Sequence, residues 1–71
     1  MKITVCTQKN RWFYKFINDF KEKIKNKNNI LNIVFDNKNI TKSDICFLIS
    51  FGKVLTKKQL LKSKFNIVFH C

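Results

Sequence analysis

The sequence predicts an α/β domain with a four-stranded parallel sheet in the order 2-1-3-4 and two helices. Four short apolar runs of strand length alternate with two segments that have a helical period or a helix-capping pattern. One run, Ile45–Ile49, is apolar at every position, as expected of a parallel strand covered on both faces. Crossover connections between parallel strands are right-handed in nearly all known proteins. A central first strand then produces the stated order.

The first strand and the first helix occupy the amino-terminal part of the chain. Residues Lys2–Cys6 are short, β-branched and apolar, and a polar loop, Thr7–Arg11, follows them. From Trp12 to about Lys27 the apolar residues are spaced three and four apart, which predicts an amphipathic helix ended by an Asn-rich run. Its aromatic residues could stack on nucleic-acid bases, but helical spacing favours a place in the core. These aromatic residues are Trp12, Phe13, Phe16 and Phe20.

The middle of the chain contains the second and third strands. Residues Ile30–Phe35 form a strand candidate, and Asp36–Asn39 is the turn after it. The segment Ile40–Asp44 is too short for a packed helix, so Ile45–Ile49 follows as the central strand. The turn after it contains the only glycine of the chain, Gly52, which indicates either a positive φ or a close approach of another group.

A short second helix is predicted after this turn. Thr56 followed by Gln59 fits a capping box, in which each side chain bonds to the backbone of the other residue. Leu60 and Leu61 are expected to supply the buried side of the helix.

The fourth strand, Phe65–Phe69, leads directly to His70 and Cys71. An outer strand in this position has an unpaired edge and an uncovered face. We therefore expect residues 1–71 to form an incomplete, Rossmann-like three-layer domain that lacks its C-terminal half.

Net charge, the length of the apolar runs and the cysteine spacing limit the kinds of function that the chain can have. A formal charge of +11 suits an acidic partner such as RNA, but almost all of it is lysine, scattered as on a solvated surface. No apolar run approaches the roughly 18–20 residues that cross a bilayer. We expect no signal peptide, and Cys6, Cys46 and Cys71 lack C-x-x-C spacing. We expect a reduced, cytoplasmic protein.

Ligands of open α/β sheets bind beyond the carboxyl ends of the strands, where His70 is expected. The first loop has no glycine, so neither a dinucleotide fingerprint nor a phosphate loop can form there. Neighbouring residues of a strand point to opposite faces, so His70 and Cys71 suit neither a metal site nor a nucleophile pair. His70 alone has a pKa suited to proton transfer near neutral pH.

Two stretches, Ser43–Leu55 and Asn66–His70, resemble the amino-terminal domain of the formyltransferases. That family includes methionyl-tRNA formyltransferase, glycinamide ribonucleotide transformylase and sugar N-formyltransferases. The resemblance implies transfer of a formyl group from 10-formyltetrahydrofolate to a primary amine, which could be an amino sugar or an aminoacyl-tRNA. It implies that His70 is catalytic and stabilises the developing oxyanion. It also implies that four residues contact the pterin of the folate, namely Phe51, Gly52, Lys53 and Val54.

The chain departs from the family at two points. Family members usually have Asn two residues before the histidine, where this chain has Val68; Asn66 lies about 13 Å from His70 along the strand. The family's downstream proline-containing loop and aspartate are absent, so we expect a truncated fragment that is inactive alone. Two alternatives are a small basic binding module for RNA or another acidic partner, and an interaction domain that self-associates through its outer strand.

Overall fold

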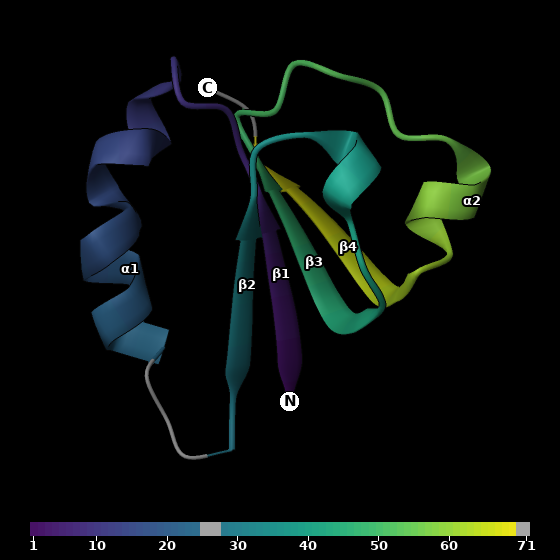
Figure 1. Ribbon diagram of the computed structural model, residues 1–71, viewed down its shortest axis with the longest axis horizontal. Helices are drawn as coiled ribbons and strands as arrows, with labels where there is room; N and C mark the ends of the chain where they lie inside the picture. The colour runs from purple at the N-terminus through teal and green to yellow at the C-terminus, as the bar shows by residue number, and fades with distance from the viewer. Residues whose placement is uncertain (25–27, 70–71) are drawn as a thin grey trace.

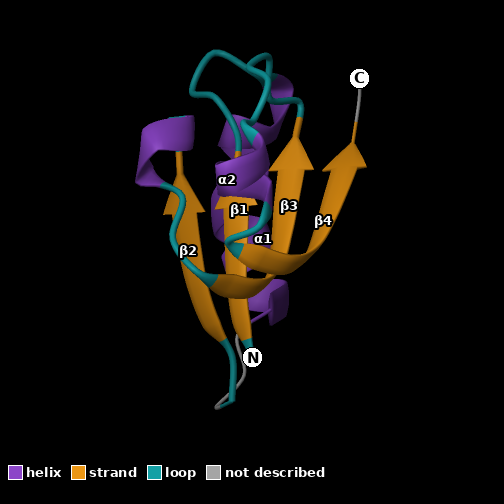
Figure 2. Ribbon diagram, turned by 90° about the vertical axis from the view of Figure 1, so that its right-hand side faces the viewer, coloured by secondary structure: helices purple, strands orange, loops and turns teal. Residues whose placement is uncertain are grey.

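The computed structural model describes residues 1–24 and 28–69. They form the predicted α/β arrangement, in which a parallel sheet of order β2-β1-β3-β4 lies between helical segments on its two faces (Figure 1, Figure 2). The strands are β1 (Lys2–Cys6), β2 (Ile30–Val34), β3 (Ser43–Ile49) and β4 (Ser63–Phe69). The 3₁₀ helices are η1 (Trp12–Phe16) and η2 (Asn37–Asn39), and the α-helices are α1 (Ile17–Ile24) and α2 (Lys57–Leu60).

One face of the sheet packs against η1 and α1. Side chains alternate between the faces of a strand, so Ile3, Val5 and Ile49 all point to this side, where they pack with Phe13 and Ile17. Phe20 of α1 also contacts the ring of Phe47 on β3, with ring centroids 6.4 Å apart. The strands that contribute side chains to this first core are β1, β2 and β3.

The opposite face carries a second core, beneath η2 and the segment before α2. Its buried members are Cys6, Val34, Ile40, Cys46 and Leu48. Because β3 contributes Cys46 and Leu48 to this core and Ile49 to the other, the fully apolar run Ile45–Ile49 is covered on both faces near its end. This confirms the prediction that the run forms a central strand.

The predicted helix from Trp12 to Lys27 is divided in two. Its first five residues form η1, and the α-helix begins only at Ile17. Arg11 stands at the N-cap and makes no side-chain capping bond, and such uncapped starts often tighten into a 3₁₀ turn. Phe13 is buried, whereas Trp12 and Phe16 are exposed, so the prediction of core aromatic residues was wrong for these two. The predicted end at Lys27 lies outside the described residues.

Strands β3 and β4 both begin two residues earlier than predicted. The hydroxyls of Ser43 and Ser63 are hydrogen-bonded to each other at 2.6 Å. Asp44 forms an ion pair with Lys64 at 3.5 Å and accepts a hydrogen bond from the backbone N–H of Lys2. These cross-strand pairs let polar residues occupy the strand starts, which an apolar pattern does not reveal.

The second helix has the predicted capping box but not the predicted buried side. The Thr56 side chain accepts from the N–H of Gln59, and the Gln59 side chain accepts from the N–H of Thr56. Leu60 and Leu61 are 38% and 74% exposed, so their predicted burial was wrong. The helix is only four residues long and turns Gln59 inward, where it bonds to Asn37 of η2. No helix among the described residues is long and apolar enough to cross a membrane.

Candidate functional site

The two stretches that resemble the formyltransferases lie side by side at the carboxyl edge of the sheet. Strands β3 and β4 are paired from Ser43 with Ser63 to Ile49 with Phe69. Just beyond β3, the N–H of Ser50 donates to the carbonyl of Phe69 at 2.9 Å. His70 follows Phe69 directly in the chain and lies outside the described residues. The structure therefore places the residue before His70 beside the start of the turn after β3.

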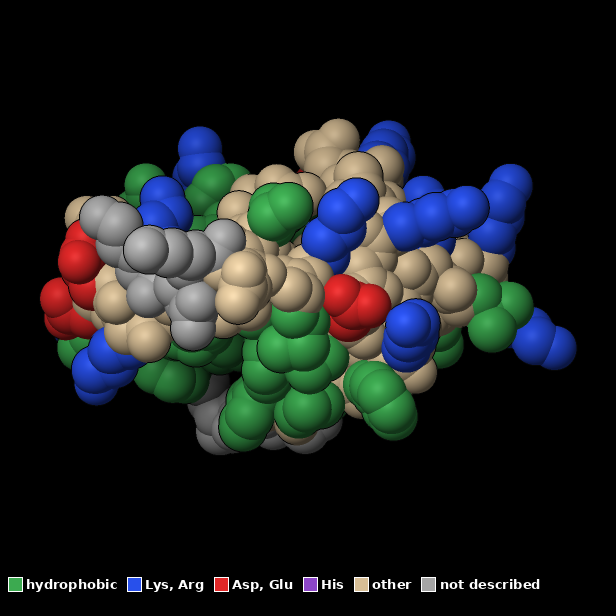
Figure 3. Space-filling view, turned by 90° about the horizontal axis from the view of Figure 1, so that it is seen from below, with side chains coloured by type: hydrophobic (Ala, Val, Ile, Leu, Met, Phe, Trp, Pro, Cys, Tyr) green, Lys and Arg blue, Asp and Glu red, His purple; other side chains and the backbone are tan. Residues whose placement is uncertain are grey.

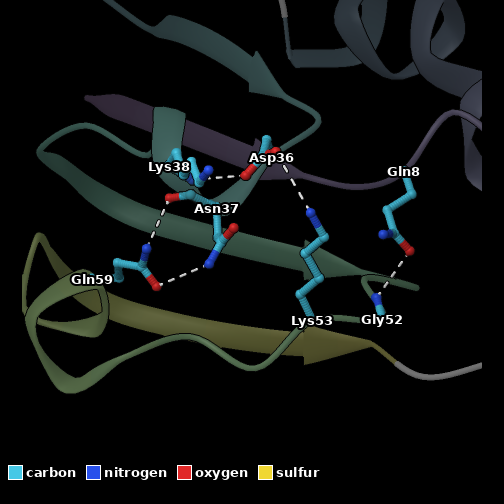
Figure 4. A network of polar contacts seen from close by, with 7 residues as sticks. All are labelled: Gln8, Asp36, Asn37, Lys38, Gly52, Lys53 and Gln59. Carbon is cyan, nitrogen blue, oxygen red and sulfur yellow. Dashed lines mark hydrogen bonds and ion pairs between the residues drawn. The ribbon is translucent and has the colours of Figure 1, made fainter.

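The turn after β3 is held against the loop after β1 (Figure 4). The side-chain oxygen of Gln8 accepts from the N–H of Gly52 and from Nε of Arg11, both at 3.1 Å. A Cβ on Gly52 would lie 2.6 Å from a guanidinium nitrogen of Arg11. The prediction of a close approach at Gly52 is therefore confirmed. The positive φ of this turn, 49°, falls on Ser50 instead.

An ion pair joins the end of β2 to the same turn. Lys53 Nζ lies 3.5 Å from Oδ2 of Asp36, whose other oxygen accepts from the N–H of Lys38 at 3.0 Å (Figure 4). The backbone hydrogen bond from Lys38 and the charge of Lys53 hold the pKa of Asp36 below its usual value. Because both groups are largely solvated, the pair positions Lys53 more than it stabilises the fold.

A mainly apolar hollow of about 480 Å³ opens on the α2 side of β3 and β4. All four residues predicted to contact a folate line it: Phe51, Gly52, Lys53 and Val54. The remaining lining residues are Leu48, Leu55, Leu60 and Val68. Sites for small molecules are usually apolar hollows of roughly 300–1,000 Å³ with few polar groups. The hollow fits that description, and Lys53 is the one charged side chain among the described residues that line it.

The hollow includes residues that sequence reasoning did not select. Leu48 and Val68 are register partners on β3 and β4, so their side chains share one face. The expected parallel pairing of the two apolar runs could have predicted that Leu48 and Val68 lie side by side. The nearby Asn66 has a structural role, since its Nδ2 donates to the carbonyl of Leu60 at 2.9 Å. Val68, in the position where the family has Asn, lines the hollow.

The chain matches no protein-family model, no curated protein and no solved structure. The fold is shown by the sheet order and its parallel pairing. The formyltransferase resemblance remains a prediction from the stretches Ser43–Leu55 and Asn66–His70, and the hollow is the feature on which it can be tested.

The buried thiols do not form part of this site. Cys6 and Cys46 are free and fully buried in the second core. Burial and the neighbouring Cys46 raise the pKa of Cys6 to about 12. Reactive cysteines are exposed and have a lowered pKa, so neither thiol is arranged as a nucleophile. Across residues 1–24 and 28–69, no three His, Cys, Asp or Glu residues are close enough together to hold a metal ion.

Proposed function

We propose that this chain is the amino-terminal part of a 10-formyltetrahydrofolate-dependent formyltransferase domain, and that the hollow beside β3 and β4 receives the pterin of the folate. The observation that carries the proposal is that the whole segment Phe51–Val54 lines one hollow. Ligands of open parallel sheets bind at this end of the strands. The acceptor is a primary amine, on an amino sugar or an aminoacyl-tRNA.

The hollow suits a flat ring system with polar edges. Leu48, Leu55 and Val68 present apolar surface to the faces of such a ring. The N–H of Gly52 is already bonded to Gln8, so the hydrogen bonds to a pterin come from neighbouring backbone groups of the turn. Lys53 stands at the hollow with its ammonium group paired to Asp36, so it can attract the carboxylates of a folate tail once that exposed pair opens.

The resemblance to the formyltransferases implies that His70 acts on the reacting carbonyl. In formyl transfer the amine attacks the formyl carbon and negative charge develops on the formyl oxygen. The C–N bond to tetrahydrofolate then breaks, and the proton lost by the amine passes to the departing nitrogen. A positioned donor such as His70 stabilises that oxygen. The chain contains no proline, so the proline-containing loop of the family is not among its 71 residues. We therefore expect this chain to bind folate weakly and to transfer no formyl group.

A nuclear magnetic resonance titration with 5-formyltetrahydrofolate tests the binding. We expect saturable shifts of the backbone amides of Phe51–Leu55 and Val68. Val54→Glu, which adds a carboxylate at an exposed position of the hollow, should weaken these shifts. Ile30→Glu is the matched control, because Ile30 is exposed and lies outside the hollow. If millimolar ligand moves no amide of Phe51–Leu55, the proposal is wrong.

Turnover is a separate readout. Pure protein incubated with 10-formyltetrahydrofolate and either methionyl-tRNA or an amino sugar nucleotide should release no tetrahydrofolate above the blank. Measurable transfer that His70→Ala abolishes would support the assignment of His70 and contradict the expected inactivity.

A second candidate function, binding of RNA, is favoured by the distribution of charge. Figure 3 looks along the sheet from the amino ends of its strands, and the lysine side chains of residues 1–24 and 28–69 gather mainly on the half away from α1. Hydrogen bonds between Asn37 and Gln59 hold η2 against α2, so the lysines of both segments share one region. The two aspartates of this half, Asp36 and Asp44, already pair with lysines. The lysines of η2, α2 and the neighbouring loops that pair with neither aspartate are Lys38, Lys42, Lys57, Lys58 and Lys62.

The salt dependence of RNA binding tests this candidate. Binding that uses these lysines should weaken steeply as salt rises, by a slope of about 0.7 per phosphate contacted on single strands. The double variant Lys57→Glu, Lys58→Glu should lower the slope. The control, Lys21→Glu with Lys23→Glu on α1, makes the same change of charge elsewhere. Equal losses from both variants would show non-specific attraction rather than a site.

A further inference from the structure

The outer strand β4 presents an open edge and an uncovered apolar stripe. Over residues 1–24 and 28–69, β4 is hydrogen-bonded as a strand to β3 alone (Figure 2). Phe65, Ile67 and Phe69 share the face on which α1 packs, and are 66%, 39% and 48% exposed. Phe20 of α1 contacts the ring of Phe47 on β3. The ring of Phe47 in turn stacks on Phe69 of β4.

The apolar stripe of Phe65, Ile67 and Phe69 can pair with the same stripe of a second copy that runs in the opposite direction. If a second β4 runs antiparallel with Ile67 opposite Ile67, Phe65 of each copy faces Phe69 of the other. Cross-strand aromatic pairs of this kind stabilise sheets. On the other face, Asn66 of each copy then faces Val68. No charged residue meets a like charge within Phe65–Phe69, because Lys64 is the only charged residue of β4.

The backbone has the orientation that this pairing requires. The carbonyl of Phe69 accepts from the N–H of Ser50 and so faces β3. Alternate residues of a strand direct their backbone groups to opposite edges. Ile67 therefore faces β3 as Phe69 does, while Asn66 and Val68 turn their N–H and C=O groups toward the open edge. There Asn66 of each copy can exchange a pair of hydrogen bonds with Val68 of the other.

We propose that two copies of this chain associate through antiparallel pairing of their β4 edges, with the two-fold axis at Ile67. The result is one continuous eight-stranded sheet, in which the Phe65, Ile67 and Phe69 side chains of both copies form one apolar surface between the two α1 helices. At 150–250 Å² per aromatic side chain, the two stripes together expose roughly 600 Å². Edge pairing buries only the flanks of these side chains and the strand edges, so the interface is smaller than the roughly 1,200 Å² at which stable specific interfaces begin.

The dimer is expected to be weak at low salt and tighter at high salt. Each copy carries a formal charge of +11, so the copies repel, and added salt screens that repulsion. RNA binding has the opposite salt dependence. This contrast separates self-association from polyanion binding, and it is independent of the folate titration.

Sedimentation velocity of the full chain over a concentration series tests the proposal. We expect a monomer–dimer equilibrium that shifts toward dimer between 50 and 500 mM NaCl. Ile67→Lys, which sets two like charges opposite each other on the axis, should raise the dissociation constant at least about tenfold. Phe65→Lys, at the most exposed position of the stripe, should act in the same direction and is the variant more certain to fold.

Ile30→Lys is the matched control. It adds the same charge at an exposed apolar residue of β2, at the opposite edge of the sheet, and it should leave the dissociation constant within about twofold. A monomer at millimolar protein and high salt would overturn the proposal. So would a dimer that folded Ile67→Lys and Phe65→Lys leave unchanged, since the interface would then lie elsewhere.

Discussion

Alkaline pH should destabilise this protein through a buried thiol, Cys6. In the folded chain the pKa of Cys6 is about 12, raised from an ordinary 9.0 by desolvation and by Cys46. Between these two values the unfolded chain releases the proton while the folded chain keeps it. Stability from this thiol is therefore fully present below pH 9 and is lost as pH rises toward 12. The loss is about 1.4 kcal/mol for each pH unit, and roughly 2–3 kcal/mol at pH 11.

The assay compares wild type with Cys6→Ala by urea unfolding at pH 8, 9, 10 and 11 in a reducing agent. Every other ionisable side chain is the same in the two proteins. The difference between the two free energies of unfolding isolates the thiol. We expect wild type to lose stability relative to Cys6→Ala by about 1.4 kcal/mol per unit above pH 9. Parallel curves for the two proteins would refute the reasoning.

Four further single substitutions and one double variant probe packing and capping. Ile40 is buried at the centre of the second core, so Ile40→Val should cost about 0.5–1.5 kcal/mol in urea unfolding. Leu61→Ala, at an exposed site, should stay within about 0.5 kcal/mol, and a larger cost would mean that Leu61 is buried in solution. Thr56→Ala should cost about 1 kcal/mol by removing one half of the capping box. Gln59→Ala should cost more, since it also removes the bonds to Asn37, and the double variant should cost less than the sum of the two.

The sheet could be predicted because its information is local. Each strand is an apolar run bounded by polar residues, and Ile45–Ile49 is apolar enough to require cover on both faces. Helical segments between the runs then require parallel pairing. The capping box of Thr56 and Gln59 was equally local and is present.

The features that could not be predicted depend on how distant parts of the chain pack against one another. A helical period indicates that one side of a helix is apolar, but not whether a partner lies over it. Leu60 and Leu61 therefore remain exposed while Gln59 turns inward. The pair of Asp36 with Lys53 and the contact of Gln8 with Gly52 join residues far apart in the chain. Only the shared carboxyl edge of a parallel sheet could have suggested them.

The candidate site was predicted in part for the same reason. Phe51, Gly52, Lys53 and Val54 are contiguous, and the structure brings all four to one hollow. Leu48 and Val68 complete it from two different strands, which a motif in one segment does not show. The predicted catalytic residue, His70, lies outside the described residues.

The central place of β1 has a consequence for synthesis. This strand is made first, yet it pairs with β2 and with β3, which ends at Ile49. At about 5–20 residues per second, a ribosome needs roughly 2–9 seconds to make the residues between Cys6 and Ile49. During that interval the apolar side chains of β1 have no complete sheet to enter. The nascent chain should therefore engage a chaperone that binds extended apolar segments until β3 has emerged, and release from that chaperone should track the emergence of Ile49.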